Sequence, residues 1–380
     1  MAWPHPTRYV GDASITSRRS LEALMAADTD FTPARNASTD GEFVRDATYI
    51  NDRVVADVPA GSEPVGDRVG EMRWPVEPGR YRLMAARACP WASRTIIVRR
   101  LMGLEGVISM GLAGPTHDVN SWVFDLDPDE RDPETGLHRL QEAYFNRIPD
   151  YPRGITVPAL VDLPTKSVVT NAYQKLNFDL LSEWTAFHRE GAPDLYPAEH
   201  RDEIDELDSW IYPTVNNGVY RCGFAADQDA YEQAYDELWE SLDRLEERLS
   251  TRRYLVGDTI TVADIRLFTT LVRFDAVYHG HFKANRNKIS EMPALWGYLR
   301  DLFQTPGFGD TCDFPQIKEH YYDVHRDVNP TGVVPKGPDL SGLLTPHHRE
   351  ELGGRPFGDG TAPGPIEDPA ERIAEGHGAA

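Results

Sequence analysis

The chain has 380 residues, enough for two domains and a sizeable core, and it carries 61 acidic against 39 basic side chains for a formal net charge of −22. So acidic a chain repels polyanions, which argues against nucleic acid or an anionic membrane surface as a partner. Three cysteines do not build a disulfide framework, no apolar run approaches the length of a membrane span, and the N-terminus lacks a signal pattern, so we expect a cytoplasmic protein.

Residues 1–79 are polar and punctuated by proline and glycine. They predict an N-terminal arm with at most one short helix, around residues 20–27. An arm of this composition buries too little apolar surface to fold alone. We therefore expect it to lie over the domains that follow.

The strongest local pattern is a strand, a helix and a second strand. These elements are predicted over residues 81–86, 90–102 and 107–110. Pro90 suits the first helical position because its missing N–H costs nothing there, and this leaves Cys89 at the helix N-terminus. The positive end of the helix dipole favours a thiolate, and Arg87 and Arg94 add positive charge nearby. Cys89 is therefore a candidate nucleophile.

The alternative for Cys89 is a small buried hydrophobe, which describes many free cysteines. The order of strand, cysteine, proline and amphipathic helix favours a reactive thiol instead. Because residue 92 is alanine rather than a second cysteine, no disulfide can close within the motif. Chemistry at Cys89 is then expected to use an external thiol.

Residues 80–190 are expected to form an α/β domain with a long irregular insertion at residues 113–155. After the insertion, the pattern predicts strands over 156–162 and 167–170 and a helix over 172–187. This order is typical of a thioredoxin-like domain, in which the proline before the third strand is cis and lies against the active-site cysteine. We expect that role for Pro158, although most X–Pro bonds are trans.

Residues 198–328 predict an all-helical domain, because apolar residues recur there at a spacing of three to four. Thr261 and Asp264 form a predicted capping box at the start of one helix, with a role in stability rather than chemistry. Residues 329–380 turn rich in proline and glycine again. This tail is expected to be extended over the surface or disordered.

Three separate segments carry a family resemblance. They are Cys89-Pro-Trp-Ala after a Tyr-x-Leu strand, Asn216-Asn-Gly-Val-Tyr220, and His320-Tyr-Tyr322. Over roughly residues 80–330 the chain resembles the glutathionyl-hydroquinone reductases, the Xi class of the glutathione transferase superfamily. The resemblance implies a thioredoxin-like domain followed by a helical glutathione-transferase-type domain, a homodimer, and an oxidoreductase that removes the thiol from glutathionyl-hydroquinones.

The resemblance also assigns site residues. Tyr220 matches the tyrosine proposed as proton donor, and Tyr278 and Tyr321 match tyrosines thought to lower the cysteine pKa and to line the quinol pocket, with Tyr322 as the alternative to Tyr321. Tyrosine suits these tasks because it combines an apolar ring with an O–H donor. For the thiol cofactor the resemblance implies Trp122, the backbone of Thr156, Val157 and Pro158, and the segment Asn171, Ala172 and Tyr173.

The chain departs from the family where a γ-glutamyl group is held. Glutathione-binding relatives follow the hairpin with an acidic and hydroxyl pair such as Glu-Ser, whereas this chain has Ala172 and Tyr173 after Asn171. The missing acid costs glutathione on the order of a few kcal/mol, or roughly a hundredfold in affinity. We therefore expect mycothiol or γ-glutamylcysteine in place of glutathione, unless Asp162 or Glu183 supplies the charge.

Other functions stay open. A conjugating glutathione transferase activates its bound thiol with serine or tyrosine, so Cys89 counts against it. A dehydroascorbate or dehalogenase-type reductase shares the single-thiol chemistry, and a non-catalytic assembly module is a third alternative. A metal site at His279, His281 and His320 is not expected, because no ligand spacing accompanies these histidines.

Overall fold

The computed structural model describes residues 36–37, 41–118, 120–365 and 369–373, and the helix expected at residues 20–27 lies outside them. In the first part of the chain, the strands and helices are β1 (Asn36–Ala37), β2 (Phe43–Val44), β3 (Arg53–Val55), β4 (Arg73–Pro75), β5 (Tyr81–Ala85), α2 (Pro90–Met102), β6 (Ile108–Leu112), α3 (Leu140–Arg147), β7 (Ala159–Asp162), β8 (Ser167–Thr170) and α4 (Tyr173–Ser182). The later helices are α5 (Arg201–Ile211), α6 (Gly218–Gly223), α7 (Gln228–Leu249), α8 (Val262–Arg273), α9 (Pro293–Gln304) and α10 (Phe314–Glu319).

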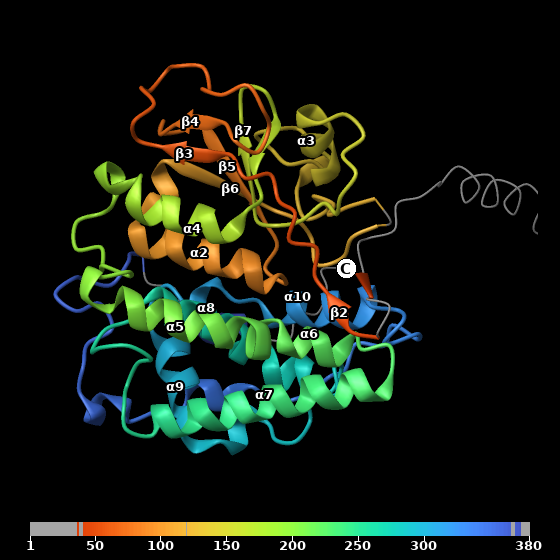
Figure 1. Cartoon of the computed structure of the whole chain (residues 1–380), viewed down its shortest axis with the longest axis vertical. Coiled ribbons are helices and arrows are strands. Elements are labelled where there is room, and N and C mark those ends of the chain that lie inside the picture. Colours follow the sequence, from red (N-terminus) through yellow and green to blue (C-terminus); the bar gives the residue numbers. More distant parts are fainter. Residues whose placement is uncertain (1–35, 38–40, 119, 366–368, 374–380) are drawn as a thin grey trace, which may run out of the picture.

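The N-terminal domain is built on a four-stranded sheet in the order β6-β5-β7-β8. β5 runs parallel to β6 and antiparallel to β7, and β7 runs antiparallel to β8. The sheet's inner strands are buried on both faces, because α2 and α4 pack together beneath it and α3 contacts β8 (Figure 1). This is the thioredoxin-like arrangement that the sequence predicted, and the helical domain lies on the far side of α2 and α4 (Figure 1).

α2 lies between the sheet and the helical domain and contacts α8. Every residue of α2 except Arg100 is buried, so the helix is covered on nearly all sides rather than amphipathic as the sequence predicted. It ends at Gly103, whose φ of 72° places the backbone in the left-handed region that glycine adopts without a Cβ penalty. Because α2 contacts both the sheet and α8, its N-terminus lies where the two domains meet.

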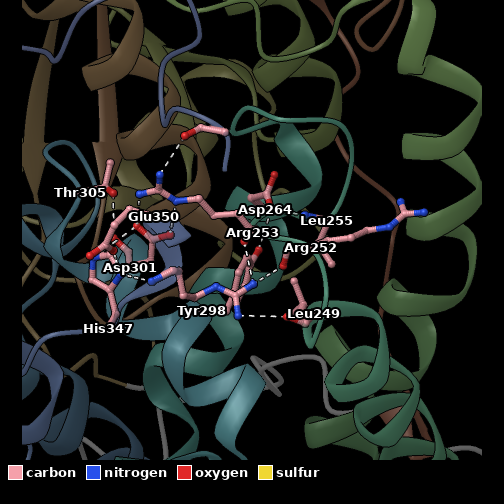
Figure 2. Close-up of polar contacts among 12 residues, drawn as sticks. Leu249, Arg252, Arg253, Leu255, Asp264, Tyr298, Asp301, Thr305, His347 and Glu350 are labelled. Carbon is pink, nitrogen blue, oxygen red and sulfur yellow. Dashed lines mark hydrogen bonds and ion pairs between the residues drawn. The ribbon is translucent and has the colours of Figure 1, made fainter. Parts of the chain in front are cut away.

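The helical domain confirms the predicted capping box at the start of α8. The N–H and hydroxyl of Thr261 donate to Asp264 Oδ2 at 2.8 and 3.1 Å. The other carboxylate oxygen accepts from Leu255 N–H at 2.9 Å and from the Tyr298 hydroxyl at 2.8 Å (Figure 2). Asp264 therefore ties α9 and the preceding loop to α8 as well as capping it.

Residues 41–79 hold more structure than a draped arm. β3 pairs with β4 in parallel and packs on α4, and Val54 is fully buried. Asn51 forms a bridge with Thr170 of β8. Phe43 packs on the rings of Tyr220 and Phe224, which belong to the helical half of the chain. The arm is thus folded onto both domains.

The C-terminal tail is anchored on the helical domain by Arg349, whose side chain is 5% exposed. Its guanidinium donates to the carbonyls of Leu249 and Arg253, both at 3.0 Å, and to the carbonyl of Arg252. These carbonyls lie at and just beyond the end of α7, where helical partners run out. Arg349 therefore acts as a cap for α7 supplied from about a hundred residues downstream.

Replacing Arg349 with alanine is expected to release the tail and to lower the free energy of unfolding by about 2 kcal/mol, because buried carbonyls lose charged donors. Limited proteolysis should cut residues 329–365 faster in this variant, and urea unfolding gives the stability change. The control is Arg355→Ala, which removes an exposed ion pair with Asp359 and should change little. An unchanged cleavage pattern in Arg349→Ala would contradict the anchoring role.

Candidate active site

Cys89 is the residue that precedes the first turn of α2, and it is 8% exposed. Its thiol donates to the carbonyl of Val157 at 3.4 Å. The Val157–Pro158 bond is cis, as the sequence analysis expected. The cysteine therefore faces the backbone that enters β7, on the side where an external thiol would have to approach.

Burial raises the pKa of the Cys89 thiol, contrary to the lowered value that the sequence predicted. The N–H of Ala92, the charge of Arg273, the N–H of Trp91 and the charge of Arg45 act in the opposite direction and offset burial only in part. The two arginines named from the sequence point elsewhere. Arg87 donates to the carbonyl of Thr311 at 2.9 Å, and the Arg94 guanidinium lies 4.6 Å from the centre of the Trp91 ring.

Two adjoining cavities open at this position. The cysteine pocket, of about 170 Å³, is lined by Cys89, Tyr220, His320, Tyr321 and His325 together with the residues it shares. The outer pocket, of about 190 Å³, is lined by residues of the arm, the insertion and the start of α4. The residues common to both are Arg45, Trp91, Trp122, Ile155, Thr156 and Val157. Val157, one of the shared residues, accepts from the Cys89 thiol, so a ligand with two parts can fill both cavities with its junction near Cys89.

Three tyrosines form a chain of hydroxyls beside the cysteine pocket. The Tyr220 and Tyr321 hydroxyl oxygens are 2.5 Å apart, and those of Tyr321 and Tyr278 are 2.9 Å apart. Tyr220 and Tyr321 line the pocket, whereas Tyr278 lies fully buried behind Tyr321. Tyr322 lines neither pocket, and its ring packs against His281. Burial raises the pKa of all three linked tyrosines, so they are neutral O–H groups at pH 7.

The segments that carry these side chains share an unusual backbone. Residues 212–216, 274–278 and 320–324 are wound as π-helical turns. Such turns carry one extra residue per turn and are concentrated at functional sites. Here they hold Tyr278, Tyr321 and His320, and one of them directly precedes the segment of Tyr220.

The outer pocket contains five of the seven residues assigned to the thiol cofactor. Trp122, Thr156, Val157, Asn171 and Tyr173 line it, whereas Pro158 and Ala172 do not. The Asn171 side chain is already used: its amide donates to Thr156 Oγ1 at 2.9 Å, and its carbonyl oxygen accepts from Ile50 N–H at 2.8 Å. Asn171 therefore fastens the arm to the pocket wall.

Comparison with known proteins shows the family to which the chain belongs. Residues 228–301 match the family model "Glutathione S-transferase, C-terminal domain". The glutathionyl-hydroquinone reductase YqjG of Escherichia coli K12 is 42% identical over 320 residues, which cover 82% of this chain and 94% of that protein. The chain belongs to the glutathionyl-hydroquinone reductases, the Xi class of the glutathione transferases.

Solved structures of relatives support the membership. A glutathione transferase from Gordonia bronchialis is 65% identical with a TM-score of 0.80, and the match covers 86% of this chain and 98% of that one. The glutathione-bound structure of YqjG is 39% identical with a TM-score of 0.72, and the match covers 82% of this chain and 98% of that one. The thioredoxin-like and helical domains described above are therefore those of a glutathionyl-hydroquinone reductase.

Within this glutathionyl-hydroquinone reductase fold, neither acid that the sequence analysis offered for the γ-glutamyl ammonium reaches the outer pocket. Asp162 is buried against Arg80, and Glu183 accepts from the backbone N–H of Ala56. The carboxylates that do line the pocket are Asp46 and Asp118. Each is already paired with an arginine, the first with Arg153 and the second with Arg139.

Sequence reasoning missed three residues around the cysteine of this reductase. Arg45 comes from the arm and is described below. His320 was considered only as a metal ligand, but it lines the cysteine pocket and stacks on Trp122 with ring centroids 4.9 Å apart. Its Nδ1 lies 2.7 Å from the carbonyl of Pro115, so it is the N–H donor, and burial lowers the pKa of His320 to about 3. The ring is therefore neutral, with Nε2 as an acceptor.

The third missed residue is Arg273, at the last position of α8 and fully buried. Its guanidinium donates to the carbonyls of Arg87 and Ala88 at 2.8 and 3.0 Å and to Ser93 Oγ at 2.7 Å. These groups flank Cys89 on both sides in the sequence. The helical domain therefore holds the backbone of the cysteine loop, a contact that no local pattern could indicate.

In the part of the chain that the structure describes, no three or more His, Cys, Asp or Glu side chains gather in a way that could hold a metal ion. Likewise, no helix among the described residues is long and apolar enough to cross a membrane.

Proposed function

We propose that this chain removes the thiol from thiol–hydroquinone conjugates through Cys89. The observation that carries the proposal is the pair of adjoining pockets, because a conjugate placed across them has its thioether sulfur beside Cys89 and its aromatic ring beside Tyr220 and Tyr321. Family membership favours this reaction over the conjugating transferase, the other single-thiol reductases and the assembly module.

The reaction proceeds in two steps. The Cys89 thiolate attacks the thioether sulfur, a disulfide bond forms between them, and the carbon–sulfur bond breaks. Its electron pair stays on the ring carbon, which takes a proton from the Tyr220 hydroxyl, and the free hydroquinone leaves. A second thiol then gives its proton to the Tyr220 phenolate and, as a thiolate, attacks the sulfur that came from the conjugate. The disulfide of the two small thiols leaves, and the Cys89 thiolate and the Tyr220 hydroxyl are regenerated.

The chain of hydroxyls suits this proton transfer. Once Tyr220 has given up its proton, Tyr321 at 2.5 Å can donate to the resulting phenolate, and Tyr278 can donate to Tyr321 at 2.9 Å. Hydrogen bonds in such a chain polarise one another and strengthen each bond. Tyr278 therefore acts through Tyr321 as a positioning residue rather than on the substrate.

For the thiol, the outer pocket favours mycothiol over glutathione. Among the described residues that line the pocket, every carboxylate is paired with an arginine, so none is left for the γ-glutamyl ammonium, and Ala172 replaces the family's acid. It does offer paired Asp and Arg side chains, Asn and Ser groups, and the rings of Tyr49, Trp122 and Tyr173. Such a lining suits an uncharged sugar-like group, which γ-glutamylcysteine lacks. We place the reaction in the cytoplasm and the enzyme in a homodimer.

The test compares the mycothiol, γ-glutamylcysteine and glutathione conjugates of one hydroquinone, menadiol, by release of free menadiol. We expect kcat/KM to be roughly a hundredfold higher for the mycothiol conjugate. The matched variant Ala172→Glu/Tyr173→Ser restores the family's pair and should raise turnover of the glutathione conjugate. Faster turnover of the glutathione conjugate by the unmodified chain would refute mycothiol as the thiol, whereas no turnover of any conjugate would refute the reductase.

A further inference from the structure

Arg45 brings a positive charge from the N-terminal arm to the active site. Its Nε donates to Asn217 Oδ1 at 3.0 Å. Its guanidinium lies 4.6 Å from the centre of the Tyr220 ring, 4.8 Å from that of Trp91 and 5.3 Å from that of Phe43. Three ring faces and one amide therefore fix the position of this cation.

Among the residues that the structure describes, no side chain of opposite charge pairs with Arg45. Within the described ranges it forms no ion pair, since the neighbouring Asp46 pairs with Arg153 instead. Its Nη2 is buried and has no hydrogen-bond acceptor among the described residues. A buried donor without an acceptor is costly, and a bound ligand that offers an acceptor would remove this cost.

The position of Arg45 between the two pockets indicates which ligand it would contact. Arg45 lines both the cysteine pocket and the outer pocket, so it lies where the two halves of a bound conjugate join. Its charge also acts on Cys89 and Tyr220, where it opposes the rise in pKa that burial causes. In the proposed reaction, negative charge moves from the Cys89 sulfur to the ring of the substrate and then to the Tyr220 oxygen.

We propose that Arg45 is a catalytic residue contributed by the arm, which contacts the conjugate at the junction of the two pockets and stabilises the negative charge of the attacking sulfur and of the departing ring. The proposal rests on the reductase function proposed above. Arg45 gives up no proton and forms no bond in the reaction. It stabilises the Cys89 thiolate before the attack and the negative charge on the ring while the carbon–sulfur bond breaks. The bound conjugate carries neither of these charges, and for this reason Arg45 raises the rate rather than the affinity.

The test uses alkylation of Cys89, which needs no conjugate. Purified full-length protein is treated with iodoacetamide, which is neutral, or with iodoacetate, which is anionic, and the Cys89 peptide is followed by mass spectrometry. In Arg45→Gln we expect the ratio of the iodoacetate rate to the iodoacetamide rate to fall about tenfold and the reaction to require higher pH. Arg45→Lys keeps the charge and should keep most of the ratio.

The matched control is Arg244→Gln, which also removes an arginine stacked on a ring, 4.2 Å from the centre of Trp210, but outside both pockets. Its ratio should equal that of the unmodified protein. If Arg45→Gln does not fold, Asn217→Ala leaves the charge in place but frees its Nε and should shift the ratio in the same direction by less. An unchanged ratio in the folded variant overturns the proposal.

Turnover of the preferred conjugate gives the second readout. Arg45→Gln is expected to lose kcat with little change in KM, and a loss confined to KM overturns the catalytic role. Because alkylation and turnover are measured separately, a failure of the reductase itself is distinguishable. In that case the unmodified protein is alkylated at Cys89 but turns over no conjugate.

Discussion

Cys89→Ser is expected to lower turnover of a thiol–hydroquinone conjugate by at least about a thousandfold, because a serine hydroxyl is a weak nucleophile and cannot form a disulfide. The fold should be retained, since the substitution exchanges one small buried group for another. The measurement is the release of free hydroquinone, with mass spectrometry to detect the mixed disulfide on residue 89. That adduct should be seen in the unmodified protein and be absent in the variant.

The pH dependence follows from the direction of the pKa shift. Burial raises the pKa of Cys89, so at neutral pH the thiol form predominates in the empty site. Only the thiolate reacts, and alkylation of Cys89 by iodoacetamide is therefore expected to rise with pH and to keep rising beyond the pKa of an ordinary thiol. A rate that is already constant across neutral pH would show that the thiol is ionised there.

Cys312→Ser is the control for both measurements. Cys312 lines neither pocket, and burial raises its pKa to about 11. This variant should turn over the conjugate at the rate of the unmodified protein. Loss of turnover in Cys312→Ser with full turnover in Cys89→Ser would contradict the choice of nucleophile.

Arg273→Met is expected to lower the free energy of unfolding by about 3 kcal/mol or more, the larger of the two stability effects proposed for this chain. The variant leaves the carbonyls of Arg87 and Ala88 and the hydroxyl of Ser93 without their donor at a buried position. Urea unfolding measures the loss. Arg286→Met is the control, because that arginine forms a surface ion pair with Asp243 and should be worth little.

A second readout separates support of the cysteine loop from general stability. Arg273 is one of the charges that lower the pKa of Cys89, so the pH at which Cys89 is alkylated should move upward in Arg273→Met. Arg273→Lys should restore part of this shift even where stability is not restored, since the charge is retained. An unchanged alkylation profile in Arg273→Met would limit the residue to a structural role.

The sequence predicted features that depend on short stretches of chain. Pro90 and the strand before it were enough to place Cys89 at a helix start, and the spacing of Thr261 and Asp264 was enough for the capping box. The three tyrosines came from the family resemblance and not from periodicity. Their hydroxyl chain could not be predicted, because Tyr220 and Tyr321 are 101 residues apart.

The errors have a common physical cause. The pKa of Cys89 was predicted from its own helix, but it is dominated by burial under segments far away in the sequence. The two cations that act on it, Arg45 and Arg273, lie outside the motif altogether, whereas Arg87 and Arg94 within the motif have other partners. Long-range burial and charge are set by tertiary structure, and no local pattern reports them.

Because Arg273 of the helical domain binds the loop around Cys89, the two domains are not independent of each other. Without the helical domain, the groups on both sides of Cys89 would lose the guanidinium that holds them. The arm connects the two domains a second time, because it donates hydrogen bonds to Asn171 of the N-terminal domain and to Asn217 of the helical domain. Exchanging either domain between relatives would therefore reset the reactivity of the nucleophile itself, even with every residue of its own motif unchanged.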